Sequence, residues 1–301
     1  MSEERRGVVF GAAAYGIWGL FPLYWPLLEP AGAAEILAHR FVWSFVFILI
    51  VLIAARQLGR LRAVSTDRRR MVPLTAAACL ISVNWYVYVY SVNSGHVVEA
   101  SLGYFIVPLI TVLLGVVVLR ERLRPAQMAA VAVAAIAVVV LAVDYGRPPW
   151  IALALAASFG TYGLLKKKVA VSSTDGLAVE SGVLLLPAVG YLAMLEVSGQ
   201  SAFGHAGTAN ALLLAASGVV TAVPLLLFAS SARRVPLVTL GLLQYLAPLL
   251  QFLIGVLIVD EQMPPVRWVG FGLVWVALML FTSDQLRRQR RGPGAPHPLS
   301  L

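Results

Sequence analysis

The sequence has little charge and almost no cysteine. Only 12% of its 301 residues are Asp, Glu, Lys or Arg, whereas 60% are hydrophobic, and soluble domains carry about 25% charged residues. The one cysteine, Cys79, lies in an apolar run, which excludes a disulfide framework and a cysteine-based metal site. Such a composition is typical of a membrane protein.

Motifs that carry common enzyme chemistry are also absent. There is no Gly-x-x-x-x-Gly-Lys phosphate loop, no His-Glu-x-x-His motif and no aspartate-rich pair of the kind that holds magnesium. We therefore expect no enzyme activity, no cofactor and no metal. A channel is disfavoured as well, because no repeated ring of acidic residues or filter-like segment is visible.

The net charge of +9 does not indicate nucleic acid as a partner. The basic residues stand in short blocks between apolar runs instead of forming one extended patch. No cleavable signal peptide is expected, because the first apolar run leads directly into further apolar runs.

Ten apolar runs are long enough to be membrane helices, which need roughly 17–25 residues each. The alternating short stretches of an outer-membrane barrel are not seen, and only helices otherwise satisfy a spanning backbone. The predicted fold class is therefore an all-α polytopic membrane protein. Its ten predicted spans are residues 8–28, 33–55, 73–93, 98–119, 126–144, 149–165, 177–197, 210–232, 236–258 and 266–284.

The basic blocks predict how these helices are oriented. With ten spans, almost all basic residues fall on one side, and only Arg147 and Arg267 fall on the other. Because Lys and Arg favour cytoplasmic loops, both termini are predicted to be cytoplasmic in a multi-pass protein of the bacterial plasma membrane. The basic residues on the predicted cytoplasmic side are Arg5, Arg6, Arg56, Arg60, Arg62, Arg68, Arg69, Arg70, Arg120, Arg122, Arg124, Lys166, Lys167, Lys168, Arg233, Arg234, Arg287, Arg288, Arg290 and Arg291.

One segment occurs twice. "GYFIVPLITVLLGVVVLRERLRP", which begins at Gly103, resembles "GLLQYLAPLLQFLIGVLIVDEQMPP", which begins at Gly241. Five spans separate the copies, and because five is odd, the copies have opposite orientations. We predict two inverted five-helix repeats, residues 1–145 and 146–285, followed by a basic disordered cytoplasmic tail at 286–301. The positions that match 140 residues apart are Glu35 and Asp175, Pro108 and Pro248, Gly115 and Gly255, Glu121 and Glu261, and Pro125 and Pro265.

Inverted repeats are a recurrent plan of secondary transporters, with the binding site at the interface between the halves. The symmetry offers two arrangements of similar energy, one open to each side of the membrane. The alternative is a duplication without transport, that is, an integral membrane scaffold or regulatory subunit that keeps the fold.

The run "EILAHRFVWS", which begins at Glu35, carries charge into the second span. Glu35, His39 and Trp43 share one helix face, and Arg40 lies about 7 Å beyond Glu35 on the adjacent stripe. Two interpretations of Arg40 stay open: a structural role, in which it extends toward the outer surface or pairs with Glu35 or Glu99, or a group that binds an anionic part of a substrate. In the second, Glu35 and His39 would couple proton movement, although a satisfied core histidine is a common alternative.

The third span contains "NWYVYVYSVN", which begins at Asn84. Asn84 and Tyr88 follow helical spacing, and Trp85 lies beside Asn84. This polar strip among aromatic rings either orients an amphipathic solute or makes hydrogen bonds between helices.

The fourth span begins near Glu99, for which a carboxylate at a helix start is the economical interpretation and proton coupling the alternative. His96 and Glu99 lack a third ligand for a metal site. Gly103 permits close backbone approach, and Pro108 removes a hydrogen bond at mid-span, as Pro248 does in the ninth span. Paired breaks in corresponding helices point to a transport site.

Tyr104 and Gln244 lie near these breaks and are predicted to face the site, with a packed aromatic ring and an amide bonded to a neighbouring helix as the alternatives. The predicted substrate-binding residues are therefore Arg40, Trp43, Asn84, Trp85, Tyr88, Tyr104 and Gln244. The predicted proton-coupling residues are Glu35, His39 and Glu99, and the predicted helix breaks are Gly103, Pro108 and Pro248.

Four stretches resemble the RarD-type permeases of the EamA family, within the drug/metabolite transporter superfamily: "YGIWGLFPLYW", "EILAHRFVWS", "NWYVYVYSVNSGHVVEASLGYFIVPL" and "GVVVLRERLRPAQ". The resemblance covers about residues 7–284 and implies ten helices around a central cavity and the transport of small organic solutes. One departure is Val107, which stands where the family usually has Asn. The expected partners are a small-molecule substrate, protons and membrane lipid, with the chain as a monomer or homodimer.

Overall fold

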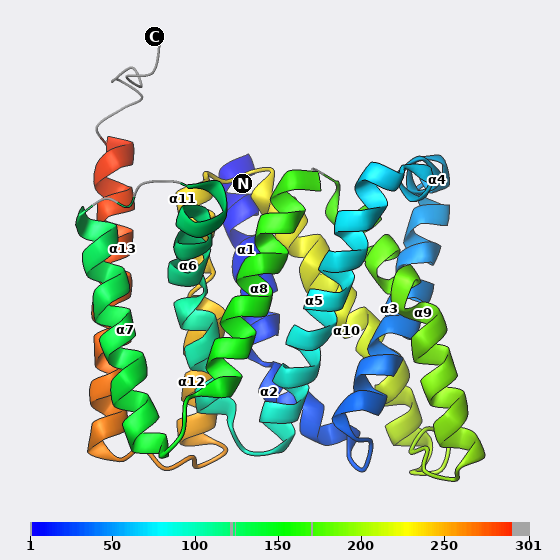
Figure 1. Cartoon of the computed structure of the whole chain (residues 1–301). Coiled ribbons are helices and arrows are strands. Elements are labelled where there is room, and N and C mark those ends of the chain that lie inside the picture. The colour runs from blue at the N-terminus through cyan, green and yellow to red at the C-terminus, as the bar shows by residue number, and fades with distance from the viewer. Residues whose placement is uncertain (1, 121–122, 124, 170, 291–301) are drawn as a thin grey trace. The chain divides into compact units, whose positions relative to one another are not determined.

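The computed structural model describes residues 2–120, 123, 125–169 and 171–290. Within these residues the secondary structure is helical and contains no strand (Figure 1). Glu121 and the last part of the predicted tail, 291–301, lie outside them. The elements are α1 (Glu3–Gly19), α2 (Phe21–Tyr24), η1 (Trp25–Leu28), α3 (Ala33–Ala54), α4 (Leu58–Thr66), α5 (Arg68–Asn93), α6 (Val97–Leu119), α7 (Pro125–Tyr145), α8 (Trp150–Val169), α9 (Ser173–Val197), α10 (Thr208–Ala232), α11 (Leu237–Leu243), α12 (Leu246–Leu257) and α13 (Pro265–Arg290).

Eight spans in the described part of the chain are long and apolar enough to cross a bilayer. The number rises to nine if α1 and the segment Phe21–Leu28, which meet at a 43° bend, form one span. The apolar part of α8, Trp150–Lys166, is shorter. The prediction of an all-α polytopic membrane protein is confirmed, whereas the number ten, the inverted repeat and the side of the termini stay predictions.

α4 lies where the sequence suggested only a basic loop. It exposes Arg60 and Arg62 and buries Val64, which packs against Leu74 of α5. Asp67 ends α4 and caps α5, because its Oδ1 accepts a hydrogen bond from Arg69 N (2.9 Å). The short polar helix is thereby joined directly to the following span.

The chain divides into two compact units. Unit 1 comprises Met1–Val107 and Trp150–Gln262, and unit 2 comprises Pro108–Pro149 and Met263–Leu301. This division by compactness differs from the predicted division by repeat at residue 145, which stays a prediction. The candidate site described below belongs to unit 1.

Unit 1 is built from helices that pack along one another. α3 packs against α9 and α10, α5 against α8, and α1 against α10 and α12 (Figure 1). An apolar cluster joins η1, α3, α5 and α8 through the buried side chains of Trp25, Ile36, Val89 and Leu155. In a water-soluble protein, burial of a side chain of this size stabilises the fold by about 1.5–3 kcal/mol. Here burial removes these side chains from lipid and fixes the helices against each other.

Glycines allow the closest helix contacts in unit 1. A Cβ atom at Gly218 of α10 would lie 2.2 Å from the backbone carbonyl carbon of Trp43 in α3. At Gly7 of α1 it would lie 2.6 Å from Arg234 Cβ, and at Gly11 2.7 Å from Ser231 Oγ. Small residues at membrane helix interfaces permit this approach, so α3 and α1 both lie directly against α10.

α3 and α9 are antiparallel, and a polar contact ties them at each end. Near the start of α3, Glu35 Oε1 accepts hydrogen bonds from Ala202 N (2.8 Å) and Phe203 N (3.3 Å) in the loop after α9. Beyond the end of α3, Arg60 Nη2 pairs with Asp175 Oδ2 (3.1 Å) at the start of α9. The two acidic residues that match in the predicted repeat therefore lie at opposite ends of this helix pair.

Two further carboxylates occupy helix N-termini. Glu99 Oε1 accepts a hydrogen bond from Ile151 N (3.1 Å) at the start of α8. Glu261 Oε1 accepts hydrogen bonds from Val97 N and Val98 N at the start of α6, the second at 3.0 Å. A carboxylate at a helix N-terminus satisfies free N–H groups and the helix dipole, so both residues position helices of unit 1.

The helix breaks differ between the two predicted positions. α6 runs through Pro108 without interruption. α11 ends at Leu243, α12 begins at Leu246, and Pro248 lies in the first turn of α12, where its missing N–H removes no intrahelical bond. Gly103 provides close contact, because a Cβ atom there would lie 2.9 Å from Ala152 O of α8.

In unit 2, α7 packs along α13 (Figure 1). A Cβ atom at Gly270 would lie 2.5 Å from Leu141 Cδ2, which shows how close this contact is. Arg267 Nε pairs with Asp144 Oδ2 (2.8 Å), and its guanidinium lies 4.4 Å from the centroid of the Tyr145 ring. One of the two basic residues on the predicted outer side is thus neutralised within this unit.

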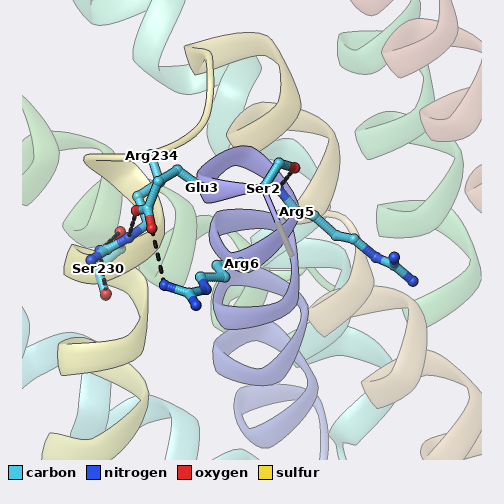
Figure 2. A network of polar contacts seen from close by, with 6 residues as sticks. All are labelled: Ser2, Glu3, Arg5, Arg6, Ser230 and Arg234. Carbon is cyan, nitrogen blue, oxygen red and sulfur yellow. Dashed lines mark hydrogen bonds and ion pairs between the residues drawn. The ribbon is translucent and has the colours of Figure 1, made fainter.

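The start of α1 is joined to the end of α10 by a polar network (Figure 2). Glu3 receives Arg6 Nη1 (3.1 Å) on one carboxylate oxygen and Arg234 Nε (3.0 Å) on the other. Arg234 Nη1 also donates to Ser230 O (2.8 Å) and Ser230 Oγ (2.7 Å). Ser2 Oγ caps α1 by accepting from the backbone N–H of the third helical residue (3.3 Å).

Candidate functional site

Arg40 is a buried cation in a membrane helix. It lies on α3, seven residues after Ala33 and thus about 10 Å from the start of the helix. Only 2% of its surface is exposed. Ionisable residues at such depth face a partner or a cavity, so the groups around Arg40 decide its role.

Two indole rings flank the Arg40 guanidinium. Its carbon lies 4.5 Å from the ring centroid of Trp25 in η1 and 4.1 Å from that of Trp85 in α5. Cation–π contacts of desolvated cations are worth about 2 kcal/mol. Arg40 Nε also donates a hydrogen bond to Thr221 Oγ1 of α10 (3.1 Å). Four elements of unit 1 therefore meet at this guanidinium.

Arg40 forms no ion pair within the described part of the chain, and its Nη1 has no hydrogen-bond partner there. The predicted structural partners are engaged elsewhere, since Glu35 binds the loop after α9 and Glu99 binds the start of α8. The charge is thus held by aromatic rings and one hydroxyl instead of by a carboxylate.

Asn84 joins α5 to α6 and α8. Its Nδ2 donates to Leu155 O (3.0 Å) and Ser158 Oγ (3.1 Å), and its Oδ1 accepts from Tyr104 Oη (3.0 Å). Of the two interpretations of the polar strip, the structure contains the hydrogen bonds between helices. These bonds hold the Tyr104 ring against Tyr88, with centroids 5.6 Å apart in an edge-to-face arrangement.

Several buried polar atoms near Arg40 lack a hydrogen bond within the described residues. Tyr88 Oη and Gln251 lie beside each other, and neither Tyr88 Oη nor Gln251 Oε1 nor Trp25 Nε1 is paired with a third group in the described part of the chain. Gln251 Nε2 is satisfied, because it donates to Trp18 O (3.1 Å). Buried polar groups are nearly always hydrogen-bonded, so these atoms are the candidates for polar contacts with a ligand.

A cavity of about 320 Å³ opens beside α3, near the loop after α9. Its polar lining comes from His39, Trp43, Glu196 and Ser201, and the remaining lining is apolar. Trp43 Nε1 donates to His39 Nδ1 (3.2 Å), and the Phe203 ring lies 4.7 Å from the His39 ring. The loop segment held by Glu35 thus covers the predicted proton-coupling histidine.

The predicted site residues separate into groups. Arg40, Trp85, Tyr88 and Tyr104 come together with Asn84 behind them, whereas His39 and Trp43 line the separate cavity. Gln244 is half-buried at the end of α11. Glu35 and Glu99 bind backbone N–H groups of the loop after α9 and of α8.

Trp25, Thr221 and Gln251 of the site were not predicted from the sequence. Gln251 had a visible signal, as a lone amide in an apolar helix three residues after Pro248, whereas the sequence prediction named Gln244, four residues before it. Within the described residues, no three His, Cys, Asp or Glu side chains gather as a metal site requires.

Multiple apolar helices, with a buried cation that has no counterion within the described residues, define a polytopic membrane protein. The chain belongs to the EamA-like transporter family, which matches residues 5–143 and 148–283. It is therefore a multi-pass integral membrane transporter, and the predicted RarD-type EamA permease is confirmed.

Relatives of known name share nearly the whole chain. Protein RarD of Streptomyces exfoliatus is 56% identical over 290 residues, which cover 96% of this chain and 92% of the relative. The uncharacterized transporter YojE of Bacillus subtilis is 44% identical over 299 residues, covering 96% and 97%. The chloramphenicol-sensitive protein RarD of Pseudomonas aeruginosa is 32% identical over 297 residues, covering 97% and 98%.

A solved structure titled only "Crystal structure of protein" has the same fold. It aligns with a TM-score of 0.59 over 91% of this chain and 96% of its own, at 20% sequence identity.

Proposed function

We propose that this protein is a secondary active transporter that moves a small organic metabolite or amphipathic drug with an anionic group across the bacterial plasma membrane by alternating access. The observation that carries this proposal is the buried Arg40, which has no carboxylate partner within the described residues. Membership of the EamA-like transporter family supports it. The proposal includes no chemical step, so the protein acts as a carrier and not as an enzyme.

The contacts of Arg40 favour an oxyanion as its ligand. The two indole rings cover the guanidinium carbon, and Nε is used by Thr221. The edge of the guanidinium that carries the Nη atoms remains for a ligand. Such an edge matches the two oxygens of a carboxylate or the oxygens of a phosphate. A ligand that supplies this charge removes the cost of a buried unpaired cation.

The remainder of the solute would contact the surrounding rings and amide. Tyr88 Oη can donate or accept a hydrogen bond, and Gln251 Oε1 can accept one. Tyr104 offers an apolar ring edge. A site with few polar groups among aromatic surfaces suits an amphipathic or zwitterionic solute. Trp43 and His39 line the cavity nearer the loop after α9 and are proposed as its entry from the outer side.

Alternating access would require unit 1 to open at either end. One end is held by Glu35 on Ala202 and Phe203. The other is held by Glu3 on Arg234, with Arg6 beside it (Figure 2). The basic residues of α1 and α4, together with Arg233 and Arg234 after α10, support a cytoplasmic location for the second end.

The test is the thermal stability of the purified protein against a panel of carboxylates, phosphates and zwitterions, each paired with its neutral ester or amide. A binder at 100 times its Kd adds about 2.7 kcal/mol. We expect stabilisation by an anionic solute, its loss with the neutral analogue, and its loss in Arg40→Gln. Arg62→Gln, which removes the same charge from the exposed surface of α4, is the control.

An equal response to each anion and its neutral analogue, or an unchanged response in Arg40→Gln, would remove Arg40 from the binding site. A protein that responds to no solute and moves none in reconstituted vesicles would be the non-transporting scaffold or regulatory subunit.

A further inference from the structure

A second buried charge lies in unit 1, apart from Arg40. Glu180 of α9 accepts hydrogen bonds from Lys166 Nζ (2.7 Å) on Oε1 and from Tyr162 Oη (3.1 Å) on Oε2, both from α8. The Glu180 side chain is 5% exposed and the Lys166 side chain 21%. Neither the sequence motifs nor the proposed anion site uses this group.

The local sequence builds the cluster from two helix faces. Tyr162 and Lys166 are four residues apart on α8, and Gly176 and Glu180 are four residues apart on α9, so each pair shares one face. A Cβ atom at Gly176 would lie 2.1 Å from Lys166 Nζ. Glycine at this position therefore gives the ammonium the room to reach the carboxylate.

Arg40 and Glu180 occupy matching positions in the predicted repeat, because they are 140 residues apart, as Glu35 and Asp175 are. Each lies seven residues after the first residue of its helix, about 10 Å from that end. Because α3 and α9 are antiparallel, the two charges lie toward opposite ends of unit 1. One is a guanidinium that stays charged, and the other is a carboxylate that can be neutralised.

Some of the other charged groups on the helices near Glu180 are paired with one another. On α9, Asp175 is paired with Arg60 of α4, and Arg70 of α5 is paired with Asp67. α10 has no ionisable residue, and those of α3 lie in its first turns, at the other end of the α3–α9 pair. The remaining ionisable residues on α4, α5, α8 and α9 are Arg62, Arg68, Arg69, Cys79, Tyr86, Tyr88, Tyr90, Lys167, Lys168, Tyr191 and Glu196.

The contacts of Glu180 differ from those of Glu35 and Glu99, whereas the buried Asp175 is also bonded by side chains, those of Arg60 and Ser172. Glu35 and Glu99 accept backbone N–H groups, which neither change charge nor move independently of their helices. Glu180 is bonded only by side chains, and Lys166 has access to the surface. Protonation of Glu180 would therefore release Lys166, whose ammonium group water can then solvate.

We propose that Glu180 is the proton-binding site of the transporter, with Lys166 and Tyr162 holding its charged form. In the deprotonated state the carboxylate ties α8 to α9 through both partners. A proton from water on the Lys166 side adds to one carboxylate oxygen, Lys166 keeps its own charge and leaves, and the Tyr162 hydroxyl stays bonded to the acid. The role in coupling rests on the proposed transport function, but proton binding itself does not.

Infrared difference spectroscopy of the full-length protein, between high and low pH and without any solute, tests this site. We expect a buried carboxylic-acid band on acidification that is absent in Glu180→Gln. The exposed Glu196→Gln is the matched control and retains the band. Lys166→Met removes the cation that favours the carboxylate, so the band should then appear at a higher pH.

A band that persists in Glu180→Gln, or that appears at an unchanged pH in Lys166→Met, would overturn the proposal. If Glu180→Gln does not fold, Lys166→Met alone decides, because a band from any other carboxyl group would not change its pH when Lys166 is removed. Since no solute is present, these outcomes do not depend on whether Arg40 binds an anion.

Discussion

At the scale of single residues, Arg40 depends on the shape of its guanidinium as well as on its charge. Arginine offers a planar edge that binds two oxygens at once, and it stacks on indole rings, whereas lysine is a compact charge with neither property. Trp25, Trp85 and Thr221 each contact a part of the guanidinium that lysine lacks.

We therefore predict that Arg40→Lys binds the anionic solute 10- to 100-fold more weakly, although the positive charge is kept. The range corresponds to the loss of one charged hydrogen bond, about 1.5–3 kcal/mol. Isothermal titration with the solute found in the stability screen measures it. Equal affinity in Arg40→Lys would show that a point charge suffices and that the indole rings serve only the fold.

Part of the candidate site was predictable because charge in a membrane segment is rare. Arg40, Trp85, Tyr88 and Tyr104 stood out as polar or aromatic residues of neighbouring spans. Trp25, Thr221 and Gln251 did not, because their roles depend on contacts between distant segments. Thr221 lies 181 residues from its hydrogen-bond partner Arg40, and without the tertiary fold it is one hydroxyl in an apolar helix.

At the scale of helices, the contact of α3 with α10 depends on one missing side chain. A Cβ atom at Gly218 would meet the carbonyl carbon of Trp43 at 2.2 Å and its Cβ and O at 2.5 Å. Backbone atoms cannot move aside as a flexible side chain can, so the two helices would have to separate. The same helices carry Arg40 and Thr221, whose hydrogen bond would lengthen with that separation.

Gly218→Ala is therefore expected to destabilise the protein by about 1–3 kcal/mol, the usual cost of overpacking. Gly163→Ala is the matched control, because Gly163 is an exposed position of α8 with no heavy atom within 4 Å of an added Cβ. Alanine there should be neutral or stabilising by about 0.5–1 kcal/mol. Thermal unfolding in detergent compares the two. A stable Gly218→Ala variant would mean that α3 and α10 lie farther apart than described.

The helices themselves were more predictable than their interruptions. Long apolar runs determine where a chain crosses a bilayer, and the predicted runs fall on the observed helices. α4 was missed because its sequence is polar and its only buried residue is Val64. The break between α11 and α12 comes before Pro248 and not at it, and α6 accommodates Pro108, because tertiary packing decides whether a proline interrupts a helix.

At the scale of the whole molecule, the predicted inverted repeat gives a reason for an unequal distribution of charge. Glu35 and Asp175 match in position and in role, since both join α3 and α9. Arg40 and Glu180 match in position but carry opposite charges. A repeat that kept its carboxylates at helix ends and changed its mid-helix charges would place an anion site and a proton site in its two halves.

The orientation of the chain is the remaining prediction, and it can be tested apart from transport. Because basic residues favour cytoplasmic loops, we expect the α4 end of the helices to be cytoplasmic and the loop at Arg147 to be outside. In a Cys79→Ser background, a membrane-impermeant thiol reagent applied to intact cells should label Arg147→Cys. Arg62→Cys, on the exposed surface of α4, should react only after permeabilisation. The reverse labelling pattern would mean that the chain has the opposite orientation in the membrane. The anion would then reach Arg40 from the cytoplasmic side.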